Sequence, residues 1–103
     1  MRKYRVEITR IAESDIQEIF EYISRDNKAA AIKWLEEIER QIDMLEDFPL
    51  RCPVIPEAQE LEEEYRHLIY GNYRTIFRIG GSKVIIMRVI HGARLLDLQM
   101  FEK

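Results

Sequence analysis

Apolar and polar side chains alternate along the chain with two different periods, and each period predicts one kind of element. Residues 4–8 alternate between apolar and charged side chains, which predicts a half-buried strand at the start of the chain. In residues 10–47 the apolar side chains recur at spacings of three and four, which predicts amphipathic helices. The chain is therefore expected to begin with one strand followed by a helical region.

The helical region divides into two helices. Thr9 can cap the first helix, and the polar segment 24–27 interrupts the pattern before a second helix from about Lys28 to Asp47. A short link between two amphipathic helices predicts an antiparallel helical hairpin. The apolar stripes are formed by Ala12, Ile16, Ile19, Phe20 and Ile23 in the first helix and by Ala31, Trp34, Leu35, Ile38, Ile42 and Leu45 in the second.

A proline-rich connector follows the helices. Phe48-Pro49 ends the second helix, and residues 49–56 contain all three prolines of the chain, which predicts an extended segment. Residues 57–64 are acidic and polar, and they fit either a loop or a short helical turn. A solvated surface is the simpler interpretation of this acidic run, and an acidic metal site is the alternative.

Three strand-like runs come next, separated by turns rich in glycine. Gly71-Asn72 and residues 80–82 tolerate positive φ, which is typical of hairpin turns. The third run is apolar at nearly every position, which predicts a central strand covered on both faces. A tail, residues 95–103, fits a short strand or a helical turn. The three runs are Tyr65–Tyr70, Tyr73–Ile79 and Lys83–His91.

These elements predict an α+β fold of two layers. The order is β-α-α-β-β-β, and the antiparallel helical hairpin should pack on one face of a mainly antiparallel four-stranded sheet. The 103 residues suit one domain that spans the whole chain, 1–103. The other face of the sheet is then expected to carry arginines.

Charge is distributed unevenly along the chain. Residues 65–96 contain no acidic side chain but hold six basic ones and both histidines, whereas residues 1–64 hold 17 of the 19 acids. This asymmetry indicates a surface that meets an anion, either a nucleic acid or an acidic protein segment. No apolar run approaches the ~20 residues of a membrane helix, so we expect no membrane partner. The single cysteine, Cys52, fits a small, partly buried residue and a reducing cytoplasm.

Arginine and histidine are the candidates for chemistry. Arg74, Ile76 and Arg78 share one face of their strand, and the face of Thr75 and Phe77 is the better core candidate. The arginines can be read as a solvated face or, together with neighbouring tyrosines, as a site for phosphates and bases. Each histidine is read first as structural and second as a general acid or base. No motif for a metal or a nucleotide is present.

Two motifs stand out in the last third of the chain: Arg66-x-Leu68-x-x-Gly71-x-Tyr73-Arg74-x-x-Phe77 and Arg88-Val-Ile-His91-Gly92-Ala93-Arg94. Upstream of them lie the two predicted helices and the Phe48-Pro49 connector. In this combination, which covers nearly the whole chain, the sequence resembles the ParE/RelE superfamily of type II toxin–antitoxin toxins, and the ParE branch in particular.

The resemblance implies a toxin neutralised by a cognate antitoxin, and it offers two modes of action. RelE-like members cut mRNA on the ribosome, whereas ParE-like members inhibit DNA gyrase and are not known as enzymes. Arg74 and Arg94 match two arginines of the RelE pattern. Tyr65 and His67 stand in place of its two lysines, and no tyrosine is present near Phe101.

These departures favour the gyrase inhibitor over an enzyme. The ribonuclease, with His67, Arg74, His91 and Arg94 as its catalytic candidates, stays open as the alternative, and so does a non-toxic homologue that binds antitoxin. We expect no cofactor, a cytoplasmic protein, and a toxin–antitoxin assembly in which acids of the antitoxin approach Arg74 or Arg88. The candidates for binding gyrase or the antitoxin are Arg66, Tyr73, Arg74, Arg78, Arg88, His91, Arg94 and Phe101.

Overall fold

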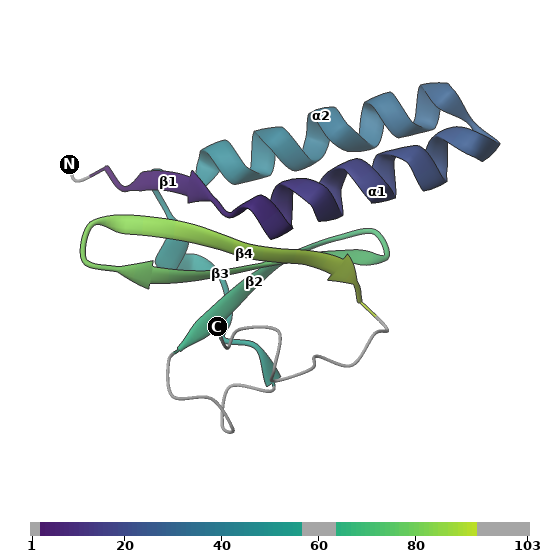
Figure 1. The fold of residues 1–103 in the computed structure, drawn as a ribbon. Helices are drawn as coiled ribbons and strands as arrows, with labels where there is room; N and C mark the ends of the chain where they lie inside the picture. The colour runs from purple at the N-terminus through teal and green to yellow at the C-terminus, as the bar shows by residue number, and fades with distance from the viewer. Residues whose placement is uncertain (1–2, 57–63, 93–103) are drawn as a thin grey trace.

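Two antiparallel helices cover one face of a four-stranded sheet (Figure 1). The computed structural model describes residues 3–56 and 64–92. The order of elements confirms the predicted β-α-α-β-β-β fold. The elements are β1 (Arg5–Ile8), α1 (Arg10–Asp26), α2 (Lys28–Met44), a 3₁₀ turn (Pro49–Arg51), β2 (Tyr65–Tyr70), β3 (Tyr73–Gly80) and β4 (Lys83–His91).

The helices begin and end where side chains satisfy their terminal backbone groups. Thr9 accepts a hydrogen bond from the Ala12 N–H and caps α1, as predicted. The polar segment 24–26 is the last turn of α1 rather than a link, so that part of the prediction is wrong. Asn27 alone joins the helices, because its N–H donates to the Ile23 carbonyl while its side chain caps α2.

The second helix ends earlier than predicted, at Met44 instead of Asp47. Residues 45–47 form turns instead of α-helix. The N–H of Leu45 donates to the carbonyl of Ile42, three residues back, rather than to the residue four back as in an α-helix. Pro49 cannot continue a helix, because it lacks an N–H and its ring obstructs the preceding turn. The chain therefore leaves the helix one turn before the proline.

The sheet has the strand order β1-β4-β3-β2, with β1 parallel to β4 and the other neighbours antiparallel. The central position predicted for the apolar strand β4 is confirmed. Gly71 and Gly81 occupy the two hairpin turns with φ of 59° and 63°, the left-handed region that suits glycine. Opposite Ile76 and Phe77 the register shifts, because Ile76 faces Arg88 while Phe77 faces Ile86. Met87 is therefore the extra residue of a β-bulge.

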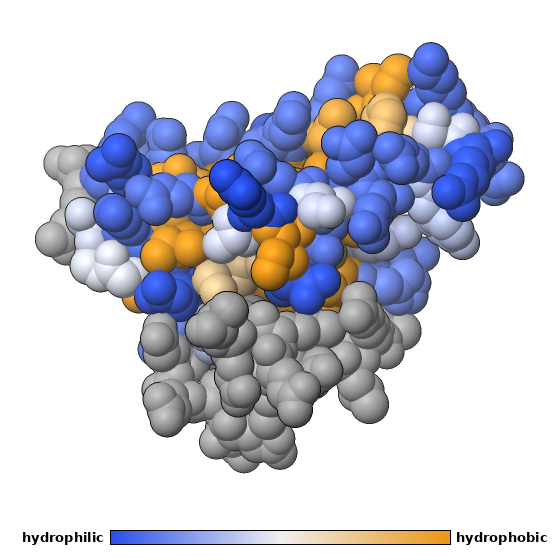
Figure 2. Space-filling model, viewed as in Figure 1, coloured by the Kyte–Doolittle hydropathy of each residue, from blue (hydrophilic) through white to orange (hydrophobic). Residues whose placement is uncertain are grey.

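The main core lies between the helices and the sheet. We call this side of the sheet the helix face. It buries the predicted stripes of both helices against alternate residues of β3 and β4, and the main buried members are Ala12, Trp34, Ile38, Ile42, Leu45, Cys52, Phe77, Val84, Ile86 and Val89. Figure 2 shows that hydrophilic residues cover most of the outer surface of the helices.

The opposite side, here called the second face, is also buried. Ile55, Tyr65, Ile76 and Ile90 form a second apolar cluster there. Arg74 lies on this side of the sheet, as expected, but it is only 6% exposed, so of the two readings of the arginines the solvated face does not hold for Arg74. The reason lies partly in the connector, because Ile55 packs on this face and keeps water away from it.

The connector departs from the fully extended segment that its prolines predicted. Residues 49–51 form a 3₁₀ turn, and only residues 53–55 run along the outer edge of β2. There the Ile55 N–H donates to the Tyr65 carbonyl, and the His67 N–H donates to the Pro53 carbonyl. The predictions for residues 57–63 and for the tail lie outside the described residues.

No helix in residues 3–56 and 64–92 is long and apolar enough to cross a membrane.

Candidate functional site

Arg74 and His67 meet on the second face of the sheet. His67 lies on β2 opposite Ile76, and Arg74 lies two residues from Ile76 on β3, so both side chains project from the same face. Arg74 is 6% exposed and His67 is 7% exposed. Nη1 of Arg74 is 3.4 Å from Nδ1 of His67. Because the guanidinium can only donate, Nδ1 accepts in this contact. A cation and an imidazole are thus held together in a largely apolar setting.

Tyr73 and His91 meet on the helix face instead. They face each other across β3 and β4 with ring centroids 5.5 Å apart, and Tyr73 also contacts Trp34 of α2 at 5.6 Å. Burial raises the pKa of the Tyr73 phenol, so it stays protonated at neutral pH. Next to this pair a cavity of about 520 Å³ opens between α1 and the end of β4, lined by Glu18, Glu21 and Tyr22 among others.

The pairing register therefore separates the two histidines onto opposite faces of the sheet. His67 of β2 pairs with Ile76 of β3, and His91 of β4 pairs with Tyr73 of β3. Tyr73 and Ile76 are an odd number of positions apart on β3. Side chains an odd number of positions apart on a regular strand point to opposite sides. His67 and His91 therefore stay separate candidates for an acid or base, because the fold does not bring them together at one site.

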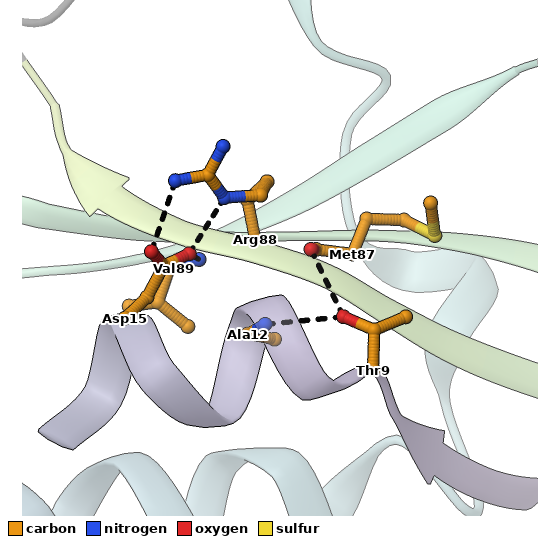
Figure 3. Close-up of polar contacts among 6 residues, drawn as sticks. All are labelled: Thr9, Ala12, Asp15, Met87, Arg88 and Val89. Carbon is orange, nitrogen blue, oxygen red and sulfur yellow. Dashed lines mark hydrogen bonds and ion pairs between the residues drawn. The ribbon is translucent and has the colours of Figure 1, made fainter. Parts of the chain in front are cut away.

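Arg88 is bound by Asp15 of α1, a residue that the sequence analysis did not single out (Figure 3). Nε of Arg88 is 2.7 Å from Oδ2 of Asp15, and Nη2 is 2.9 Å from Oδ1, which makes a bidentate pair. The side chains are 14% and 12% exposed. The hydrogen bonds that the guanidinium donates to Asp15 raise the pKa of Arg88 further above its ordinary value, so the guanidinium stays charged. Asp15 thus supplies from within the chain the carboxylate that was expected from an antitoxin.

The Asp15 carboxylate also accepts a backbone hydrogen bond from β4, at a point beyond the end of β1. Oδ2 of Asp15 accepts the Val89 N–H at 3.0 Å, and the Thr9 hydroxyl donates to the Met87 carbonyl at 3.2 Å (Figure 3). The first turns of α1 therefore cover a strand edge that β1 is too short to pair. One signal in the sequence points to Asp15: it lies three residues after Ala12 and four before Ile19, so it is an acid within the apolar stripe.

The other candidates have separate locations. Arg66 holds the connector, because Nη1 donates to the Cys52 carbonyl at 2.6 Å and Nη2 to Glu64 at 3.0 Å. Arg78 is half-buried and shares the second face with Arg74. Arg94 and Phe101 lie outside the described residues. Within residues 3–56 and 64–92 no group of three or more His, Cys, Asp or Glu side chains could hold a metal ion.

Cys52 is buried at the end of the 3₁₀ turn, as its sequence context predicted. Burial raises the pKa of the thiol, and the charge of Arg66 offsets this only in part. At pH 8 we therefore expect iodoacetamide to alkylate Cys52 at least about tenfold more slowly in the folded protein than in urea. Mass spectrometry of timed samples measures both rates, and equal rates would contradict the burial of this thiol.

The sequence model of the family described as the ParE toxin of type II toxin–antitoxin systems, parDE, matches residues 6–96. The chain belongs to the ParE toxin family. The match includes both helices, the strands β2, β3 and β4, all of β1 except Arg5, and every candidate residue except Phe101.

Solved structures agree with the family fold. The chain is similar to a chain of a chromosomal ParDE system from P. aeruginosa, with a TM-score of 0.72 and 21% identity over 86% of this chain and 96% of that one. It is also similar to a chain of the RelBE2 toxin–antitoxin complex from Mycobacterium tuberculosis, with a TM-score of 0.56 and 27% identity over 86% and 98%. No curated protein sequence matches it significantly. This ParE-family toxin thus shares its fold with a chain of a ParDE system and a chain of a RelBE2 toxin–antitoxin complex.

Proposed function

We propose that this ParE-family toxin inhibits DNA gyrase without acting as a nuclease, and that a cognate antitoxin neutralises it. The observation that carries the proposal is the separation of His67 and His91 onto opposite faces of the sheet. Cleavage of RNA through the 2′-hydroxyl needs a base and an acid at one phosphate, with charge stabilisation beside them. Nη1 of Arg74 lies 3.4 Å from Nδ1 of His67, whereas His91 faces Tyr73 on the other side of the sheet.

The similar solved structures support the antitoxin partner. They are a ParDE system and a RelBE2 toxin–antitoxin complex, so chains of this fold occur together with antitoxins. We expect a short reading frame beside the gene for this protein, and its product should co-purify with the toxin. Failure of the two proteins to associate would contradict this part of the proposal.

Gyrase supercoiling assays test the target. The purified toxin should inhibit supercoiling of relaxed plasmid by gyrase and accumulate cleaved DNA, whereas translated mRNA mapped by primer extension should show no new cuts. The control variant Lys33→Ala, a change at an exposed position on α2 outside the binding candidates, should inhibit gyrase within about threefold of the wild type, as surface substitutions rarely perturb the fold.

The ribonuclease alternative predicts the opposite results in the two assays. It predicts cuts within codons that Arg74→Lys or His67→Gln abolish, with gyrase unaffected. Circular dichroism of these variants shows whether they are folded, so that a loss of cutting can be assigned to chemistry. Codon-specific cuts by a toxin that leaves gyrase active would overturn the proposal.

A further inference from the structure

An apolar pocket lies at the outer edge of β2, far from the Asp15–Arg88 pair. Its volume is about 320 Å³, and the end of α2, the connector and β2 all contribute to it. Several of its large apolar side chains are well exposed, and Ile69 is 64% exposed. We call this surface the β2-edge pocket; its apolar lining is formed by Met44, Leu45, Phe48, Cys52, Leu68 and Ile69.

The backbone beside this pocket is an open strand edge. The Tyr65 carbonyl and the His67 N–H face the connector, which bonds both of them. Backbone groups two residues apart point to the same side of a strand, so those of Ile69 face this edge too. The connector turns away at Pro53, and no strand in the described part of the chain continues alongside Ile69.

The apolar pocket and the open strand edge beside it together indicate which kind of ligand fits here. An open N–H and C=O on a strand edge are best satisfied by the backbone of an extended peptide. A pocket of this size with an apolar lining takes one bulky apolar side chain. At the rim the Arg51 guanidinium lies 4.4 Å from the centre of the Phe48 ring, so the adjacent position favours an acidic side chain. Large apolar side chains at an unpaired edge are also a risk for aggregation unless a partner covers them.

We propose that the β2-edge pocket binds an extended, apolar and acidic segment of the antitoxin, which adds a strand beside Ile69. The proposal rests on the antitoxin partnership above and assigns it a location. One apolar side chain of the segment fills the pocket between Phe48 and Leu68, and a neighbouring carboxylate meets Arg51. The segment lies in line with residues 53–55 of the connector, at the point where the connector stops pairing.

A second copy of the chain fits this edge poorly. Two β2 strands related by a two-fold axis would have to pair along residues 65–69. The connector already occupies the edge as far as His67. Only the short stretch from Ile69 to the turn would remain for pairing between two copies. Each copy would bring its own connector along the same edge, so a partner that lacks this connector fits the stretch better.

Thiol footprinting tests the location. In the background of Cys52→Ser, which removes the only cysteine, Ile69→Cys places a reactive thiol at the pocket. The antitoxin encoded by the neighbouring reading frame should slow its alkylation by at least about tenfold relative to the toxin alone, because labelling then requires the segment to open. Ile11→Cys in the same background is the control, because Ile11 is exposed on α1, whose main contact with the sheet is β4 rather than β2. Its alkylation should change by less than about twofold.

Affinity measurements complement the footprint. Ile69→Pro removes the outward N–H without removing a bond to β3, and Ile69→Lys places a charge beside the apolar pocket. Each should weaken antitoxin binding by at least about tenfold, whereas Ile11→Lys should leave it unchanged. Toxicity of the variants without antitoxin shows that they are folded.

The outcomes separate the two proposals. If the wild-type toxin fails to bind the antitoxin, the partnership and this location are both wrong. If the antitoxin binds but Ile69→Cys stays as reactive as before and Ile69→Lys binds normally, only the location is wrong. The location is also wrong if the toxin alone forms a dimer that Ile69→Lys dissolves, because the edge then serves a second copy.

Discussion

Asp15→Ala should lower the free energy of unfolding by about 3–5 kcal/mol, because it leaves the largely buried Arg88 guanidinium without its anion. The change also removes the acceptor of the Val89 N–H, so two groups lose their partner at once. Urea denaturation followed by circular dichroism measures the loss. The pair joins residues 73 positions apart, so the effect should appear as global unfolding rather than fraying of one helix.

Two controls separate the buried pair from a general effect of charge. The double variant Asp15→Leu with Arg88→Met should be more stable than Asp15→Ala, because neither charge is then buried alone. Glu46→Ala breaks an exposed ion pair with Lys3 and should change stability by less than about 1 kcal/mol. Additive losses in the double variant would contradict the proposed coupling between α1 and β4.

Phe77→Ala should cost about 3–5 kcal/mol through the cavity that it leaves. Phe77 is fully buried on β3, in the cluster that joins both helices to the sheet. Domains of this kind have only about 5–15 kcal/mol of stability, so much of the variant should be unfolded and inactive in cells. Thermal unfolding of the purified variant and growth of cells that express it measure the two effects.

The antitoxin provides a test of the same variant. A partner that binds only the folded state stabilises it by mass action, so co-expression should return Phe77→Ala to the soluble fraction. Phe77→Leu keeps most of the volume and should lose less than about 2 kcal/mol. A fully stable Phe77→Ala protein would mean that the helices do not depend on this contact with the sheet.

Local patterns predicted the elements well. The stripes of both helices, the Thr9 cap and the two glycine turns depend on side chains within a few positions of each other, and all are confirmed. The helix ends were less accurate, because Asn27 can serve both helices and so shortens the link to one residue. The central place of β4 followed from its apolar run, since only a strand covered on both faces suits such a sequence.

Contacts between distant segments could not be read from local patterns. The sequence marks Asp15 as an acid in an apolar stripe, but only the fold brings it to Arg88 and to the Val89 N–H. Arg74 reads as a solvated residue until Ile55 is seen to pack on the same face of the sheet. Its partner His67 is likewise set by the register of β2 against β3.

By itself the sequence determined the order of elements, the apolar stripes and membership of a recognisable toxin family, because periodicity and short motifs are local properties. The tertiary structure decided which charges are satisfied within the chain and on which face each histidine lies. Those outcomes depend on strand register, where a shift of one residue moves every side chain to the other face. That register separates His67 from His91, and it supports the preference for gyrase over RNA that Tyr65 and His67, in place of the two lysines of the RelE pattern, first indicated.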